Sequence, residues 1–338
     1  MRVLFIGGTR FIGLAAVNHL AQAGHSVTVF HRGKTAADLP EGVTEILGDM
    51  EQLEDFAADF KRVAPEVVVH MMLVQEQDAV RTMSLFKGVV DRIVGISSAD
   101  VYRAYGRISA TEPGDPVEVP LHEDSPLRKE RYPYRAMIDN DPERRLYNYD
   151  KIPIEQTLMS DQDLPGTVLR LPMVYGPRDY QRRLYGYLKR MDDKRPAILI
   201  TKEFASWRNT RGYVDDTGAA IALAVTDARA AGRIYNVAEP DPLTETEWIQ
   251  AIADVIGWNG DIIPVDAEIL PNAFSVHGQD LIMDTSRIRA ELGFAEAIPR
   301  AEAIRRTIEW DRANPPEEVP PESFDYDAED RILNELKG

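Results

Sequence analysis

The chain of 338 residues contains no cysteine. A protein without thiols forms no disulfide, has no thiolate nucleophile and binds no metal through sulfur. Its six histidines are scattered, without a pair at helical spacing or a carboxylate cluster beside them, so we expect no metal site. The lack of disulfides suits a reducing compartment, and we expect a cytoplasmic protein.

Long hydrophobic runs are missing as well. No apolar stretch of the sequence approaches the ~18 to 20 residues that a membrane-spanning helix needs. The first predicted strand begins at Arg2, which leaves no room for a signal peptide in front of it. We therefore expect neither secretion nor a membrane partner.

Positive charge is scarce, because 39 lysines and arginines face 56 aspartates and glutamates, and the formal net charge is -17. Such a surface repels phosphate backbones, which argues against a general nucleic-acid partner. A local basic pocket for one small anion remains compatible with this balance.

What the first half of the chain does contain is a regular alternation of short apolar runs and amphipathic stretches. This alternation is typical of βαβ units, which build a parallel sheet. The predicted helices are Phe11 to Ala23, Leu53 to Val63, Glu76 to Phe86 and Tyr147 to Met159. The predicted strands are Arg2 to Ile6, Ser26 to His31, Thr44 to Leu47, Val67 to Met71, Arg92 to Ser97 and Gly166 to Leu171. We predict an α/β fold with a doubly wound parallel sheet of the Rossmann type and a smaller C-terminal domain.

A glycine-rich turn follows the first strand directly. Glycines between a strand and a helix let backbone N–H groups and the positive end of the helix approach a pyrophosphate. The turn therefore predicts a dinucleotide, held by Gly7, Thr9, Arg10, Phe11, Ile12 and Gly13.

The end of the second strand reads Phe30-His31-Arg32-Gly33-Lys34. An enzyme selective for NAD is expected to carry an acidic residue here, which holds the ribose hydroxyls. This strand end has no acid and two fixed positive charges, at Arg32 and Lys34, beside His31. The pattern favours the 2'-phosphate of NADP, while NAD and a plain exposed basic turn stay open.

Tyr147 and Lys151 are four residues apart, a spacing that places two side chains on one helical face. An ammonium there lowers the pKa of the phenol toward the working pH. Ser98 follows another apolar run and adds a hydroxyl. The three residues predict proton transfer beside the dinucleotide, although an ordinary surface pair of Tyr147 and Lys151 stays open.

Together with Leu169 to Pro177 and Arg211 to Asp216, these motifs resemble the extended short-chain dehydrogenase/reductase family, which includes nucleotide-sugar epimerases and dehydratases. The resemblance runs from Met1 to about Trp310. It implies that Ser98 hydrogen-bonds the substrate oxygen, that Tyr147 takes or gives its proton, and that Lys151 holds the nicotinamide ribose. Further cofactor contacts are implied for Asp49, Met50, Met71, Met72 and Leu171.

Several positions depart from the family pattern. Arg10 stands where relatives usually have glycine, and the string GGTRFIG resembles a divergent branch that includes an RNA-binding chloroplast protein. Asp100 stands where dehydratases place a glutamate base, but the aspartate before it is replaced by Ala99; a solvated loop acid is the alternative. Arg211 matches an arginine that grips the substrate diphosphate, whereas Met173 replaces an asparagine that touches it.

The domain organisation follows from the same reading. We predict a nucleotide-binding domain of residues 1–174 plus about 212–238, and a substrate-binding domain of about 175–211 plus 239–313. An acidic extended tail covers 314–338. The proline-rich stretch 103–145 reads as a lid that shapes a pocket, or else as a solvated surface excursion.

The expected function is an NAD(P)-dependent epimerase or oxidoreductase that acts on a carbinol of a sugar or nucleotide-sugar. The alternative is a catalytically divergent NADP-binding sensor or RNA-associated protein of the same fold, motivated by Arg10, the two methionines and Met173. A homodimer is common in the family and stays open here.

Overall fold

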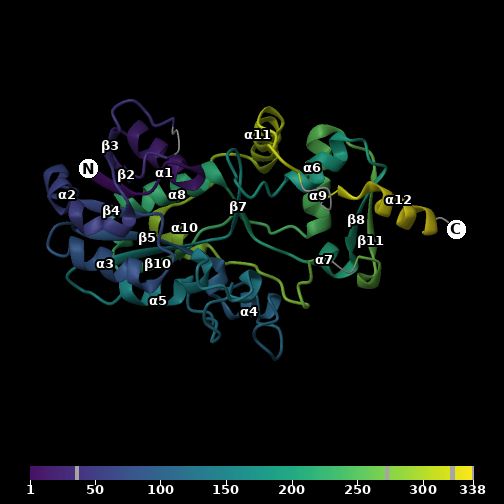
Figure 1. The fold of residues 1–338 in the computed structure, drawn as a ribbon, viewed down its shortest axis with the longest axis horizontal. Helices are drawn as coiled ribbons and strands as arrows, with labels where there is room; N and C mark the ends of the chain where they lie inside the picture. Colours follow the sequence, from purple (N-terminus) through teal and green to yellow (C-terminus); the bar gives the residue numbers. More distant parts are fainter. Residues whose placement is uncertain (35–37, 271–273, 320–323, 337–338) are drawn as a thin grey trace.

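A seven-stranded parallel sheet forms one half of the molecule, at the left of Figure 1. The computed structural model describes residues 1–34, 38–270, 274–319 and 324–336. In spatial order the strands are β10 (Arg233–Asn236), β6 (Gly166–Leu171), β5 (Arg92–Ser98), β4 (Val67–His70), β1 (Arg2–Ile6), β2 (Ser26–His31) and β3 (Thr44–Leu47). The predicted doubly wound α/β fold is confirmed. The order reverses between β1 and β4, the point where such sheets bind ligands at the carboxyl ends of their strands.

The alternation of side chains along β1 explains the two helical layers. Val3 and Phe5 pack with α1 (Phe11–Gln22) and α8 (Val214–Thr226) on one face. On the other face, Leu4 and Ile6 pack with residues of α2 (Ala57–Val63), α3 (Glu76–Phe86) and α5 (Lys151–Leu158). Strands buried on both faces read as continuous apolar runs, which is why these segments stand out in the sequence.

Helix α8 lies directly on α1, although about 200 residues separate them in the chain. A Cβ atom on Gly218 would lie only 2.6 Å from the Cβ of Ala15, so the two backbones approach as closely as glycine allows. Residues after position 212 thus return to the sheet, and β10 pairs with β6 at its edge.

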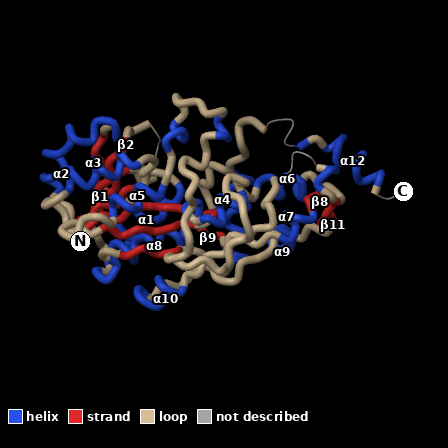
Figure 2. Tube along the Cα trace, turned by 90° about the horizontal axis from the view of Figure 1, so that it is seen from below, coloured by secondary structure: helices blue, strands red, loops and turns tan. Residues whose placement is uncertain are grey.

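The other half of the molecule carries a small parallel pair, β8 (Ala197–Thr201) with β11 (Asp261–Val265). Figure 2 places this pair at the end of the molecule opposite the large sheet. Around it lie α6 (Tyr185–Asp192), α7 (Lys202–Ser206) and α9 (Glu245–Ile256). A second pair, β7 (Met173–Tyr175) with β9 (Arg211–Tyr213), lies between the halves, and α10 (Ser286–Leu292) and α11 (Arg300–Ala313) follow later in the chain.

The predicted acidic extended tail contains a helix, α12 (Tyr326–Glu335). Asp325 accepts a hydrogen bond from the Ala328 amide at 2.9 Å and caps the helix there. Arg190 of α6 donates to Glu329 at 2.6 Å, which joins the tail to the C-terminal half. Pro320 and Pro321 of the predicted arm, and the last two residues of the chain, lie outside the described residues.

The stretch 103–145 is folded against the protein. It contains α4 (Arg103–Ile108), the 3-10 turn η3 (Ala136–Ile138) and the start of η4 (Arg145–Asn148). Glu112 is buried within the stretch and accepts hydrogen bonds from the amides of Lys129 and Glu130. Arg128 is buried as well. A solvated surface excursion is therefore the wrong interpretation of these residues.

The helix predicted from Tyr147 to Met159 is shorter than expected. Tyr147 lies in the 3-10 turn η4, Tyr149 has extended backbone, and α5 begins only at Lys151. Asp150 caps it by accepting from the Ile152 amide at 3.1 Å. Pro153 then falls in the first turn, where a backbone N–H needs no helical partner. The prediction that Tyr147 and Lys151 share a helical face is therefore wrong.

Asp150 also connects this helix to the inserted stretch. Its fully buried carboxylate lies 3.3 Å from the Arg128 guanidinium and 2.6 Å from that of Arg131. The Tyr132 amide donates to it at 3.1 Å. One carboxylate thus fixes both the start of α5 and the position of residues 128–132.

Replacing Asp150 by alanine should destabilise the protein strongly, because the variant leaves the Arg128 charge buried and uncompensated. We expect a loss of about 3–5 kcal/mol in the free energy of unfolding, measured by urea denaturation. The exposed Asp91→Ala is the control and should change stability by less than about 0.5 kcal/mol. Equal effects of the two substitutions would contradict the anchoring role of Asp150.

Candidate active site

The glycine-rich turn joins β1 to α1 at the carboxyl edge of the sheet. Gly7 and Gly8 have φ angles of +80° and +112°, which side chains rarely tolerate. A Cβ atom on Gly13 would lie 2.6 Å from the Cα of Gly8, so the first turn of α1 packs against the loop itself. The geometry leaves the N-terminus of a twelve-residue helix close to the sheet edge, where it can receive an anion.

Arg10 occupies the N-cap position of this helix with extended backbone, and its residue is exposed. Thr9 and Ile12 beside it are half-buried, whereas Phe11 is buried. Arg10 therefore lies at the N-terminus of α1, the end of a helix that attracts a phosphate.

The end of β2 carries the charges that bear on cofactor choice. Arg32 and Lys34 are exposed and form no ion pair with any residue that the structure describes. His31 is engaged, because its Nε2 lies 2.6 Å from Glu45 on the neighbouring strand β3. The sequence of this strand end contains no acid, and only the pairing of β2 with β3 brings Glu45 there.

The predicted adenine and ribose contacts follow β3 and β4. Asp49 is half-buried and caps the turn η1 (Met50–Phe56) by accepting from the Glu51 amide at 3.1 Å. Burial lowers the pKa of His70 to about 3, so its imidazole is neutral. Its Nδ1 accepts from the Met72 amide at 3.1 Å and shapes the loop that also carries Met71.

Lys151 is held between the ends of β4 and β5. Its buried ammonium donates to the carbonyl of Ile96 at 2.9 Å and to that of Leu73. Burial lowers the pKa of Lys151 to about 8. Ser98, at the end of β5, is only partly buried and has Leu171 of β6 as its register partner.

The phenol beside Ser98 belongs to Tyr149. Ser98 Oγ accepts from the Asp100 amide at 3.2 Å, the Asp100 carboxylate accepts from the Tyr149 phenol, and the Lys151 ammonium lies 5.4 Å from the centre of the Tyr149 ring. Tyr147 lies elsewhere, because the Arg135 guanidinium stacks on its ring at 4.1 Å and donates to its carbonyl at 2.8 Å. The structure thus brings Ser98 and Lys151 together with Tyr149, and it places Tyr147 in a different environment.

Asp100 is buried, with 3% of its surface exposed, so it is not a solvated loop acid. Its Oδ2 accepts from the phenols of Tyr149, at 2.8 Å, and Tyr134, at 2.9 Å. Its Oδ1 is buried without a hydrogen-bond partner among the described residues. Burial, and then the charge of Asp100, hold the pKa values of both phenols well above 10.

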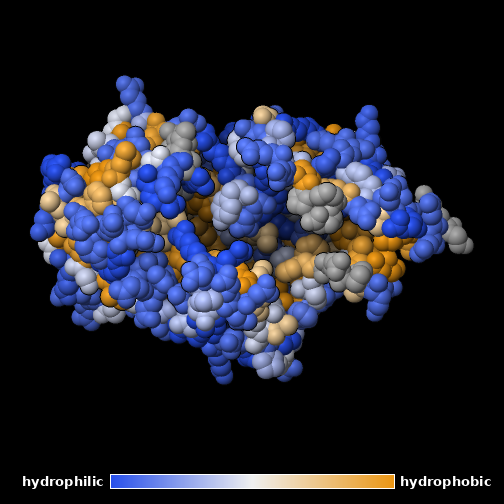
Figure 3. Space-filling view, in the orientation of Figure 1, coloured by the Kyte–Doolittle hydropathy of each residue, from blue (hydrophilic) through white to orange (hydrophobic). Residues whose placement is uncertain are grey.

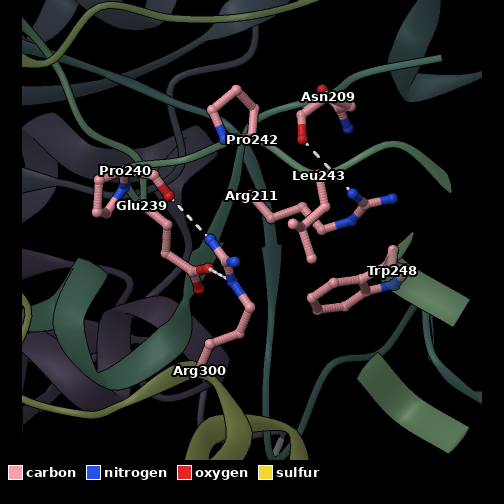
Figure 4. Close-up of a pocket in the computed structure, with 8 residues that line it drawn as sticks. All are labelled: Asn209, Arg211, Glu239, Pro240, Pro242, Leu243, Trp248 and Arg300. Carbon is pink, nitrogen blue, oxygen red and sulfur yellow. Dashed lines mark hydrogen bonds and ion pairs between the residues drawn. The ribbon is translucent and has the colours of Figure 1, made fainter. Parts of the chain in front are cut away.

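On the substrate side, Arg211 is already paired. Its guanidinium forms an ion pair with Glu245 at 2.5 Å and lies 4.4 Å from the centre of the Trp248 ring. The other Glu245 oxygen accepts from the Tyr187 hydroxyl at 2.8 Å. Figure 4 shows Arg211 and Trp248 in a small pocket, completed by Asn209, Glu239, Pro240, Pro242, Leu243 and Arg300. Glu245 was not anticipated from the sequence.

Met173 is 37% exposed, and its sulfur lies 3.7 Å from the amide nitrogen of Asn209. The face shown in Figure 3 is hollowed between the half with the large sheet and the half with α6 and α9, and apolar residues show in the hollow. Within the described ranges, no three histidine, aspartate or glutamate side chains are grouped to hold a metal ion. No helix among those residues is long and apolar enough to cross a membrane.

Residues 3–238 match the model of the NAD dependent epimerase/dehydratase family. The chain belongs to this family. The match covers more than two thirds of the chain and confirms the resemblance drawn from the motifs, and with it the expected class of enzyme. A curated relative, 2'-dehydrokanamycin reductase of Streptomyces kanamyceticus, is 26% identical over 294 residues, which are 85% of this chain and 75% of that protein.

Two more distant proteins are similar over most of the chain. The chloroplast stem-loop binding protein of 41 kDa b of Arabidopsis thaliana is 23% identical over 249 residues, which are 70% of this chain and 58% of that protein. The Bordetella bronchiseptica enzyme WbmG, solved in complex with NAD and UDP, superposes with a TM-score of 0.69 at 20% identity. This alignment covers 93% of our chain and 95% of WbmG, and it supports the fold alone.

The pKa of Lys151 gives a test of its burial. Its folded pKa of about 8 lies below the usual 10.5, so between these values the unfolded chain holds a proton that the folded chain has released. Stability of the wild type relative to Lys151→Met should therefore rise with pH across this window, by up to about 3 kcal/mol.

The measurement is urea denaturation of both proteins at several pH values from 7 to 10.5. The exposed Lys61→Met serves as the control and should run parallel to the wild type. A constant difference between wild type and Lys151→Met would show that the Lys151 ammonium is not desolvated.

Proposed function

We propose that the protein is an NAD(P)-dependent oxidoreductase or epimerase that transfers a hydride to or from a carbinol carbon of a sugar or nucleotide-sugar. The observation that carries this is the Lys151 ammonium, fixed at the ends of β4 and β5, where Ser98 ends β5, and next to the ring of Tyr149. The glycine-rich turn opens at the same sheet edge. In this proposal 1–174 with about 212–238 binds the cofactor, and 175–211 with 239–313 binds the substrate.

The roles follow from the chemistry of the groups. A nicotinamide supplies or accepts the hydride when it is bound. The Ser98 hydroxyl donates a hydrogen bond to the substrate oxygen, and Lys151 holds the ribose and the local positive charge. A tyrosine moves the proton. Family spacing assigns that phenol to Tyr147, whereas the phenol that hydrogen-bonds Asp100, two residues after Ser98, belongs to Tyr149.

If this function is right, Ser98→Ala should lower turnover by about 10²-fold or more, since the substrate oxygen loses a positioned donor. Binding of NADPH should stay as in the wild type. The assay follows the absorbance of the reduced nicotinamide with UDP-glucose, UDP-galactose, glucose 1-phosphate, methyl glucoside and their keto derivatives. Ser160→Ala, an exposed site, is the control. Absence of hydride transfer and of epimerisation across this panel would refute the function.

For the cofactor we propose NADP. Arg32 and Lys34 are the support, because both are exposed and neither pairs with a described residue. The nearby acid Glu45, which could otherwise hold the ribose hydroxyls of NAD, is occupied by His31. NAD stays the alternative, since the similar Bordetella enzyme was solved with it.

Calorimetric titration of the nucleotide-free protein should then show tighter binding of NADPH than of NADH. Arg32→Ala and Lys34→Ala should each weaken NADPH binding about tenfold, or about 1.4 kcal/mol, by removing a partner of the 2'-phosphate. Binding of NADH should not change, and Lys61→Ala should affect neither cofactor. A preference for NADH in the wild type would overturn the choice of NADP.

The substrate proposal covers sugars with and without a nucleotide. A diphosphate would need Arg211, which the ion pair with Glu245 already neutralises, and Met173 offers it no hydrogen bond. The names of the relatives point both ways, since one is a reductase of 2'-dehydrokanamycin and WbmG was solved with UDP. The contacts of Arg211 favour a sugar without a diphosphate.

The second candidate is a cofactor-binding protein that associates with RNA and has lost its activity. The Arabidopsis relative, which is named a stem-loop binding protein, motivates it together with Arg10, Met71, Met72 and Met173. The net charge of -17 argues against it. Binding of a stem-loop RNA at physiological salt, without hydride transfer, would favour this candidate over the enzyme.

A further inference from the structure

The function proposed so far does not decide whether Tyr147 or Tyr149 moves the proton, and it gives the buried carboxylate of Asp100 no role. We propose that Tyr149, and not Tyr147, exchanges the proton with the substrate oxygen, and that Asp100 receives that proton from Tyr149 or returns it. This inference rests on the proposed hydride transfer and names the residues that would complete it.

The position of Tyr149 follows from the start of α5. Because Asp150 caps the helix, Tyr149 precedes it in extended backbone and its phenol reaches the end of β5. There it donates to Asp100, whose own amide donates to Ser98 Oγ at 3.2 Å, and these two residues flank the proposed substrate oxygen. Tyr147 offers no such geometry, since its ring is covered by Arg135.

Only one of the two carboxylate oxygens of Asp100 accepts hydrogen bonds from described residues. Both phenols, Tyr134 and Tyr149, donate to Oδ2, while Oδ1 is buried without a partner among the described residues. A buried carboxylate oxygen without a donor is costly, so it indicates a ligand that brings one. A second hydroxyl of a sugar substrate is a donor of the right kind.

The proton balance of an oxidation is then complete within the site. The hydride leaves the carbinol carbon for the bound nicotinamide, and the hydroxyl proton moves to the oxygen of Tyr149. As it does so, Tyr149 passes its own proton to Oδ2 of Asp100, which becomes a neutral carboxylic acid. Reduction of a carbonyl runs the same transfers in reverse, with Tyr149 as the donor to the new hydroxyl.

The electrostatics support a relay of this kind. A phenol whose pKa is raised by burial and by Asp100 is neutral near pH 7, so it can take a proton only if it gives one away. The Lys151 ammonium does not donate to the Tyr149 oxygen, because it is directed at the carbonyls of Leu73 and Ile96. The carboxylate of Asp100, which accepts the hydrogen bond of that phenol at 2.8 Å, is the group to which Tyr149 can give its proton.

The inserted stretch gains a role from this arrangement. Tyr134, which it contributes, donates to the same Asp100 oxygen and packs edge-on against Tyr149, with ring centres 4.9 Å apart. We assign Tyr134 as a positioning residue that holds the carboxylate toward Tyr149. Tyr134→Phe should lower kcat about tenfold and leave KM unchanged, a split that a general loss of structure would not give.

The decisive experiment compares Tyr149→Phe with Tyr147→Phe in the full chain, with NADPH or NADP and the same sugar panel. Tyr149→Phe should lower kcat by about 10²-fold or more, Tyr147→Phe should stay within about threefold, and Asp100→Asn should resemble Tyr149→Phe. Calorimetric binding of NADPH and the urea midpoint are measured for each variant. A loss of turnover in Tyr147→Phe, or full activity of Tyr149→Phe, would overturn the inference.

A second measurement decides the case without turnover. The phenolate absorbance of the wild type minus that of Tyr149→Phe gives the titration of this one phenol. The midpoint of this titration should lie well above pH 10 and should shift downward in Asp100→Asn. An ordinary midpoint that Asp100→Asn leaves unchanged would refute the pairing. The ionisable groups around the phenol are Asp100, Tyr105, Tyr134 and Lys151, with His70 and Arg145 beyond the lysine. If the coupling is present but no sugar of the panel reacts, the proposed function fails and the relay geometry stands.

Discussion

The site depends on one buried carboxylate, that of Asp150. A fully desolvated aspartate is stable only when hydrogen bonds and opposite charge surround it, and here Arg128, Arg131 and two backbone amides do so. Since three of its partners come from the inserted stretch and one from α5, the same group sets where the helix starts and where the insertion lies. The positions of Lys151 and Tyr149 follow from that choice.

The sheet could be predicted because its information is local. Leu4 and Ile6 alternate with Val3 and Phe5 on a strand that is buried on both faces. The glycine turn at Gly7 indicates where that strand ends and where the following helix begins. Four strands have the predicted bounds and two differ by one residue at an end. The sequence also contains a signal for the start of α5, because the capping residue Asp150 is followed by Pro153 in the first turn. The family spacing of tyrosine and lysine outweighed that signal.

The contacts that set the chemistry could not be predicted, because they join residues remote in sequence. Glu45 reaches His31 through the pairing of two strands, Glu245 reaches Arg211 from the helix after the next strand, and Tyr134 reaches Asp100 from an irregular segment. None of these partners carries a local pattern. Each one occupies a polar group of a residue chosen from a motif, so the motif identifies the residue and the fold decides which partners its side chain has.

The pattern of charge pairing also separates the two ends of the proposed cleft. In a chain with a net charge of -17, an arginine can bind an anion readily only if it does not already form an ion pair with an aspartate or glutamate. Arg32 at the cofactor end is exposed and pairs with no described residue, whereas Arg211 at the substrate end is buried against Glu245. A diphosphate that took Arg211 would leave Glu245 buried without its counter-charge, at a cost of about 3–5 kcal/mol. No described acid pairs with Arg32, so the proposed 2'-phosphate would break no ion pair there. The fold therefore opposes an anion more strongly at Arg211 than at Arg32.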